Sequence, residues 1–80
     1  MEVSILLELY RVYPSPLMLK SLAAVCETSS KTINTHLSRL LRLELIESRV
    51  GLDARAKFYG LSKLGESRVR AYIKLHESND

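Results

Sequence analysis

The hydrophobic period of this chain changes just past its midpoint from a helical to a strand spacing, and the change limits the folds that the chain can adopt. Over residues 29–43, the aliphatic side chains Ile33, Leu37 and Leu40 recur at intervals of three or four residues. That spacing predicts a helix with one apolar face. Over residues 45–50, apolar and polar residues alternate, which is typical of a strand buried on one side. A helix that leads directly into a strand favours a small mixed domain over a helical bundle.

Two further helices are predicted ahead of this one. Residues 3–13 place their polar side chains in one narrow stripe, which leaves an apolar arc of about 220°. An arc that wide fits a helix at the centre of the domain, or a helix that contacts its own core on one side and a second subunit on the other. Pro14 and Pro16 end this helix, because proline supplies no N–H and disfavours helix at the preceding residue. Residues 17–27 predict the second helix, although its first residues also fit an extended conformation.

A hairpin and a last helix follow the change of period. Residues 45–50 and 56–61 predict two strands with a short turn between them. Ser62 is placed to cap a helix over residues 63–76, because its hydroxyl can accept a backbone N–H at the helix start. The predicted order is therefore three helices, a hairpin and a fourth helix, in one domain over residues 1–80.

The composition excludes several classes of protein. Apolar residues make up 46% of the chain, which is enough for a folded domain and argues against disorder. No apolar run is long enough for a membrane span, and the N-terminus lacks the basic lead of a signal peptide. A single cysteine, Cys26, allows no internal disulfide. We therefore expect a cytoplasmic protein that has no membrane partner.

The positive charge of the chain is concentrated in its middle. The net charge is only +3, but residues 31–63 hold seven basic and three acidic residues, whereas residues 1–30 carry a net charge of −1. A surface with this imbalance attracts a polyanion.

The polar side of the helix over residues 29–43 carries much of this charge. Its basic side chains can neutralise phosphates, and its Ser, Thr and Asn side chains let the backbone approach base edges in a major groove. The start of the helix offers free N–H groups to a phosphate. A solvated face normally mixes Glu with Lys, yet no acid lies between Lys31 and Leu43. The pattern therefore predicts contact with double-stranded DNA rather than with water alone.

The hairpin adds a second basic group. Arg49, Arg55 and Lys57 cluster around its tip, opposed only by Asp53. A basic hairpin that follows a recognition helix can reach along the DNA backbone toward the next groove. The alternative is a turn that charge keeps soluble. The predicted DNA-binding side chains are Ser29, Ser30, Lys31, Thr32, Asn34, Thr35, Ser38, Arg39, Arg42, Arg49, Arg55 and Lys57.

Two segments resemble a known family. TSSKTINTHLSRLLRLELIESR is similar to the recognition segment of the ArsR- and MarR-type winged helix-turn-helix regulators, and DARAKFYGLSKLGE is similar to the MarR-type wing and exit. The matching positions of the first segment are Ser29, Thr32, Ile33, His36, Leu37, Leu40, Leu45 and Ile46. The resemblance covers roughly residues 5–66. It implies a mainly α fold with a β-hairpin, in which a three-helix core carries a two-stranded wing and a C-terminal helix.

The resemblance also implies how such a chain meets DNA, with wing residues near the minor groove. The implied major-groove contacts are Thr32, Asn34, Thr35 and their neighbours. Three residues depart from the family pattern. Glu27 and Glu44 stand where glycines are usual, and Arg39 stands where an apolar residue is common. We expect Arg39 to be an additional DNA contact.

A homodimer is the implied assembly, and two of the predicted helices support it. The helices over residues 3–13 and 63–76 carry more apolar surface than one small domain needs. A two-fold dimer predicts half-sites about one helical turn of DNA apart. The predicted interface residues are Ile5, Leu9, Val12, Val69, Tyr72, Ile73 and His76.

No catalytic residue, metal ligand or cofactor is predicted. Cys26, His36 and His76 lie on different predicted helices, so they do not form the clustered ligands of a metal sensor. Cys26 lies on the inner side of its helix and is interpreted as a small core residue rather than a redox switch. No nucleophile motif, glycine-rich phosphate loop or carboxylate pair appears, so we do not expect an enzyme. A core of this size is expected to fill with its own side chains and to leave no pocket for a small-molecule effector.

Two other functions fit part of the pattern. Winged helices also serve as protein-interaction modules of transcription or replication assemblies, and such a module would show no salt-sensitive DNA binding. Binding of RNA or of single strands would favour stacking aromatic side chains. Only Phe58 and Tyr59 lie near the basic surface, and Tyr59 is expected to face inward.

Overall fold

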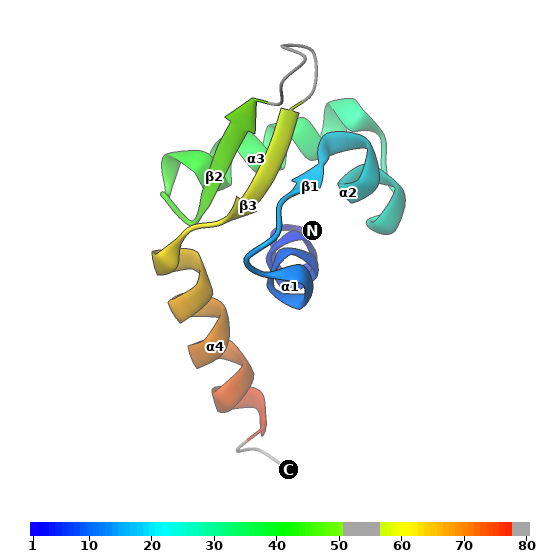
Figure 1. Ribbon diagram of the computed structural model, residues 1–80. Helices are drawn as coiled ribbons and strands as arrows, with labels where there is room; N and C mark the ends of the chain where they lie inside the picture. Colours follow the sequence, from blue (N-terminus) through cyan, green and yellow to red (C-terminus); the bar gives the residue numbers. More distant parts are fainter. Residues whose placement is uncertain (51–56, 78–80) are drawn as a thin grey trace.

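The computed structural model describes residues 1–50 and 57–77, which form four helices and three strands (Figure 1). The helices are α1 (Glu2–Val12), α2 (Leu19–Val25), α3 (Ser30–Arg42) and α4 (Lys63–Glu77). The strands are β1 (Leu17–Met18), β2 (Ile46–Val50) and β3 (Lys57–Leu61). The predicted order of three helices, a hairpin and a fourth helix is confirmed.

The strands form one antiparallel sheet in the order β1-β3-β2, so the hairpin has a third strand that was only partly foreseen. Leu17 pairs with Tyr59, and Met18 pairs with Phe58. The start of the predicted second helix is therefore extended, and helix begins at Leu19. In Figure 1 the sheet lies across α3. Helix α1 lies below β1, and α4 runs away from α3.

One apolar core joins the helices to the sheet. It takes its side chains from every helix and from the β2–β3 hairpin, because each of these elements has apolar residues on the side that faces the others. The buried apolar residues are Ile5, Leu9, Leu22, Ala23, Ile33, Leu37, Leu40, Ile46, Tyr59, Leu61 and Val69. The inward position predicted for Tyr59 is confirmed, since its side chain is 4% exposed.

Two helices end on a glutamate in the left-handed backbone region, at φ 53° for Glu27 and φ 62° for Glu44. After α3, the N–H of Glu44 donates to the carbonyl of Leu41, and the N–H of Leu45 donates to the carbonyl of Leu40. This is the Schellman arrangement, in which glycine is the usual residue because it lacks a Cβ. The end of α2 repeats it around Glu27. Glu27 and Glu44, which stand where the family usually has glycine, therefore lie at positions where a residue with a Cβ strains the backbone.

Replacing Glu44 with glycine should stabilise the domain by about 0.5–1 kcal/mol, because the strain outweighs the extra freedom of glycine in the unfolded chain. The midpoint of thermal unfolding should rise by about 2–8 °C. The matched control is Glu47→Gly in β2, where Glu47 is paired with Gly60 in the ladder. That change should destabilise by a similar amount. A lower midpoint for Glu44→Gly, measured by circular dichroism, would contradict the strain argument.

The start of α4 is attached to the chain that follows α3. The Ser62 hydroxyl accepts the N–H of Gly65 at 2.9 Å and donates to the carbonyl of Glu44 at 2.7 Å. The backbone N–H of Ser62 donates to the carbonyl of Leu45 at 3.1 Å. The predicted cap at Ser62 is thus present, and it also fixes the direction in which α4 leaves the sheet.

Candidate nucleic-acid interface

Helix α3 has the two faces that its sequence predicts. Ile33, Leu37 and Leu40 are at most 1% exposed and form the centre of the core. The opposite face is solvent-exposed and contains only polar and basic side chains. Its exposed residues are Ser30, Lys31, Thr32, Asn34, Thr35, Ser38, Arg39 and Arg42. All of the side chains predicted to meet DNA from this helix are therefore accessible, and the contact itself stays a prediction.

The helix begins at a well-formed cap. The hydroxyl of Ser29 accepts the backbone N–H of Thr32 at 3.1 Å, and it donates to the Thr32 hydroxyl at 3.0 Å. The cap leaves other N–H groups of the first turn, such as those of Ser30 and Lys31, directed away from the helix at its exposed end. A helix start of this kind, with no acid in its first turn, favours an anion.

Two hydroxyls on the exposed face donate back to their own helix. Thr35 Oγ1 donates to the carbonyl of Lys31 at 3.3 Å, and Ser38 Oγ donates to the carbonyl of Asn34 at 3.0 Å. A hydroxyl that donates inward keeps lone pairs that can accept from outside. Thr35 and Ser38 are thus suited to accept from an exocyclic amino group at a base edge.

The basic side chains of α3 differ in their surroundings. Among the residues that the structure describes, no acidic side chain lies within ion-pair distance of Lys31 or Arg42. Arg39 is different, because its Nη1 lies 3.7 Å from Oε2 of Glu2 at the start of α1. Nothing in the sequence pattern predicted that contact, since the two residues are far apart along the chain.

A groove separates α3 from the hairpin and has a volume of about 260 Å³. Lys57 lies opposite Val50 in the ladder, so its side chain shares the sheet face that looks toward α3. The groove is lined by Asn34, Ser38, Leu41, Ser48, Arg49, Val50, Lys57 and Tyr59. Polar groups from α3 and the basic side chain of Lys57 thus line one channel, whereas the Arg49 side chain alternates to the other sheet face, beside Glu47.

The three basic residues predicted for the wing differ in what the structure shows of them. Lys57 is exposed and lines the groove. The Arg49 side chain is 63% exposed, and its Nη2 lies 3.8 Å from Oε2 of Glu47, which is a loose ion pair. Arg55 lies outside the described residues.

The predicted dimer surface needs a correction for three of its residues. Ile5 and Leu9 are 0% exposed and Val69 is 4% exposed, so these side chains belong to the domain's own core and present no surface to a partner. Val12 and Ile73 are half-buried, while Tyr72 and His76 are exposed and their rings meet in a tilted contact with centroids 4.2 Å apart. The exposed apolar side chains of α1 and α4 that the prediction missed are Val3, Leu7, Leu64 and Leu75.

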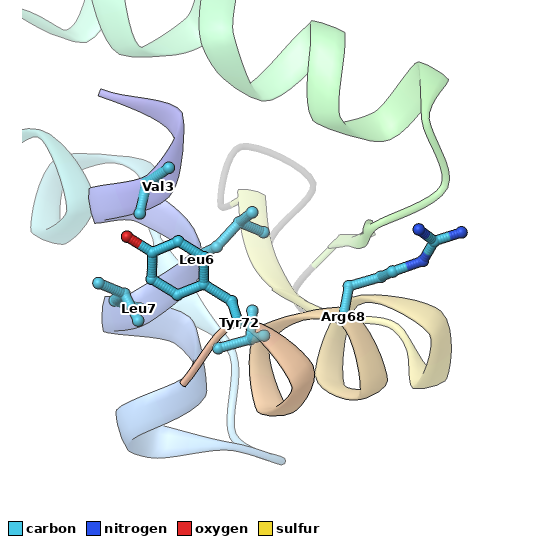
Figure 2. Close-up of a pocket in the computed structure, with 6 residues that line it drawn as sticks. Val3, Leu6, Leu7, Arg68 and Tyr72 are labelled. Atoms are coloured by element: carbon cyan, nitrogen blue, oxygen red, sulfur yellow. The ribbon is translucent and has the colours of Figure 1, made fainter. Parts of the chain in front are cut away.

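A small apolar pocket of about 160 Å³ opens at the surface between α1 and α4, outside the centre of the core. Figure 2 shows Tyr72 of α4 beside Val3, Leu6 and Leu7 of α1, with Arg68 extending away from them. The cavity lining is almost entirely hydrocarbon, so it offers few polar groups to orient a ligand.

Cys26 lies on the inner side of α2, as predicted, and is half-buried. Burial, with the nearby Glu8 carboxylate, raises the pKa of its thiol above the ordinary value. The thiol is therefore protonated at neutral pH and is a poor nucleophile. Within residues 1–50 and 57–77, no three His, Cys, Asp or Glu side chains gather as a metal site would require. In the same ranges, no helix combines the length and hydropathy of a membrane span.

Several solved structures share this fold. The Staphylococcus aureus MepR–DNA complex superposes with a TM-score of 0.91 at 26% identity, covering 96% of this chain and 63% of the MepR chain. A MepR mutant bound to an oligodeoxyribonucleotide gives a TM-score of 0.90 at 26% identity, over 96% of this chain and 56% of that one. A mutant of Lactococcus lactis ZitR in its apo form gives 0.83 at 20% identity, over 98% and 58%. The chain thus spans less than two thirds of the length of these proteins. No family model and no curated protein sequence matches it.

The fold and the exposed face together define the class of this domain. Helices α2 and α3 with the turn between them are a helix-turn-helix, and the β2–β3 hairpin that follows is a wing. The domain is therefore a winged helix-turn-helix, and its backbone follows that of MepR, which is described as a transcription regulator of the Staphylococcus aureus multidrug efflux pump MepA. The family expected from the recognition segment is supported at the level of fold.

Proposed function

We propose that the protein regulates transcription by binding double-stranded DNA, with α3 in the major groove and the wing on the backbone. The observation that carries this proposal is the exposed face of α3, where polar and basic side chains stand without an acid of their own helix. These exposed Ser, Thr and Asn side chains add nothing to the packing of the core, whereas they suit base edges and phosphates. The likeness to a MepR–DNA complex supports the same assignment.

The groove between α3 and the hairpin completes the proposed contact. A duplex that receives α3 in its major groove brings one sugar–phosphate strand up to the hairpin. Lys57 can then meet a phosphate while Asn34 and Ser38 face the same strand from the helix side. In this arrangement Lys31 and Arg42, at the two ends of α3, contact the phosphates that flank the major groove.

The proposed assembly is a homodimer formed through α1 and α4. Leu7 and Tyr72 are 37% and 41% exposed and line one pocket with Val3, so these three side chains form one apolar patch. A second copy that covers this patch would place two α3 helices on one side of a duplex. The oligomeric state then determines the DNA site.

The experiment that tests the proposal is selection of duplexes from a random pool, followed by gel shifts and sedimentation of the complex. We expect enriched sequences to be inverted repeats with centres about one helical turn apart, bound by two protomers. Enrichment of an unrepeated site bound by one protomer would remove the dimer from the proposal. Failure to enrich any duplex, with retention of a protein partner instead, would favour the interaction-module alternative.

A further inference from the structure

The side of α3 that faces α1 carries a small charged cluster, which includes Arg39, one of the predicted DNA contacts. Oε2 of Glu2 lies 3.1 Å from Nδ1 of His36 and 3.7 Å from Nη1 of Arg39. One carboxylate oxygen therefore meets two nitrogens that are one helical turn apart along α3. Glu2 reaches this position because α1 begins next to the middle of α3.

The burial of the three side chains shows which of them can move. The side chains of Glu2 and His36 are 26% and 31% exposed, so the ring and the carboxylate are held between the two helices. The side chain of Arg39 is 71% exposed, and at 3.7 Å its contact is longer than a hydrogen bond. Arg39 can therefore leave the carboxylate without disturbing the core.

We propose that His36 and Arg39 form an anion site at the edge of α3, that the Glu2 carboxylate fills this site in the free protein, and that a backbone phosphate of DNA replaces it on binding. The inference rests on the proposed function, and it adds that the Glu2 carboxylate competes with a DNA phosphate for the same site. A carboxylate and a phosphate offer the same acceptor oxygens to a guanidinium and an imidazole, so one can exchange for the other.

The exchange of the Glu2 carboxylate for a phosphate should lower the affinity of the protein for DNA. DNA binding must break the Glu2–Arg39 contact, and the displaced carboxylate remains close to the incoming phosphate, which repels it. Both effects weaken DNA binding. Glu2 thus lowers the affinity for DNA and sets it below the value that the basic surface alone would give.

The test uses the full chain with Met1 as its first residue, and it measures binding to the selected duplex by fluorescence anisotropy. Glu2→Gln should bind about two- to fivefold more tightly for each protomer, which is the range expected from one exposed ion pair. Glu2→Asp keeps the charge at the start of α1 but is shorter by one methylene. Because it cannot hold both nitrogens, it should also bind more tightly than the wild type.

Glu8→Gln is the matched control. Glu8 lies on the same helix, its side chain is 25% exposed, and it pairs with Arg11 at 3.1 Å rather than with α3. This variant loses the same charge and should bind DNA as the wild type does. In an Arg39→Ala background, the gain from Glu2→Gln should shrink, because the cation that Glu2 holds is absent.

Any of the following outcomes would overturn the inference. Glu2→Gln that binds no more tightly than the wild type shows that no exchange takes place. An equal gain from Glu8→Gln shows that only bulk charge matters, and a gain that persists in full without Arg39 shows that this site is not involved. Because these results require a wild type that binds DNA, they leave the proposed function standing. A wild type that binds no duplex would overturn the proposed function and this inference together.

Discussion

Gly65→Ala should destabilise the domain by about 2–4 kcal/mol and lower the midpoint of thermal unfolding by on the order of 10–20 °C. A Cβ built at Gly65 lies 1.9 Å from the carbonyl oxygen of Leu45 and 2.9 Å from its carbonyl carbon. Both atoms are backbone, so no side chain can rotate away to make room. Helix α4 would have to withdraw from the residues that follow α3, which would break the bonds from Ser62 to Glu44 and Leu45.

Gly60→Ala is the control for that change. A Cβ at Gly60 in β3 meets Cα and Cβ of Pro16 at 3.6 Å, which is an ordinary van der Waals contact. We expect its stability to differ from that of the wild type by less than about 1 kcal/mol. Urea unfolding of the two variants measures the difference. Equal midpoints for Gly65→Ala and the wild type would show that α4 does not lie as close to the chain after α3 as the structure places it.

The double change Lys31→Ala/Arg42→Ala should weaken DNA binding about a hundredfold for each bound protomer at fixed salt, because each charge-assisted phosphate contact contributes about tenfold. Neither side chain has an ion-pair partner among the described residues, and both are exposed. Their removal should therefore leave the unfolding midpoint close to that of the wild type. Affinity for the selected duplex, measured by anisotropy, is the readout.

The matched control removes two cations from a different helix. Arg70 and Lys74 lie on α4, which runs away from α3 in Figure 1. Arg70→Ala/Lys74→Ala has the same net charge as the α3 double variant, and we expect it to keep most of its affinity for DNA. A similar loss in both double variants would mean that net charge, rather than the face of α3, determines binding.

The main elements of this fold could be predicted because their patterns are long enough to read. The thirteen residues of α3 span more than three turns, so the apolar face defined by Ile33, Leu37 and Leu40 shows clearly. Strand β1 has only two residues, which is too short for any period, and its pairing with β3 depends on the rest of the sheet. Here tertiary contact, rather than local pattern, determines the structure.

The predicted dimer interface shows a second limit of sequence-based prediction, which concerns the side of a helix that faces the core. The wide apolar arc of α1 indicated two buried sides but did not indicate which side faces the core. The structure assigns Ile5 and Leu9 to the core and leaves Val3 and Leu7 exposed, so part of the predicted interface is on the wrong side of the helix. An amphipathic pattern gives the width of an apolar face, whereas its partner depends on how the other elements pack.

The candidate DNA-binding face was predictable, but its acidic neighbour was not. Lys31 and Arg42 could be chosen from the helical period and the absence of acids within α3. Glu2 reaches His36 from another helix, across 34 positions of the chain, and only the fold brings them together. The same holds for the groove, since Lys57 and Ser38 line it together only after the hairpin folds against α3.

The salt dependence of duplex binding tests most directly whether this face of α3 binds DNA. With six or more phosphate contacts, the wild type should lose about a thousandfold in affinity between about 50 and 200 mM salt. For Lys31→Ala/Arg42→Ala, the slope of log affinity against log salt should be shallower by about 0.9 for each phosphate that the variant no longer neutralises, or roughly 2 per protomer. A wild-type affinity that hardly changes with salt, or a double variant with the wild-type slope, would contradict the account.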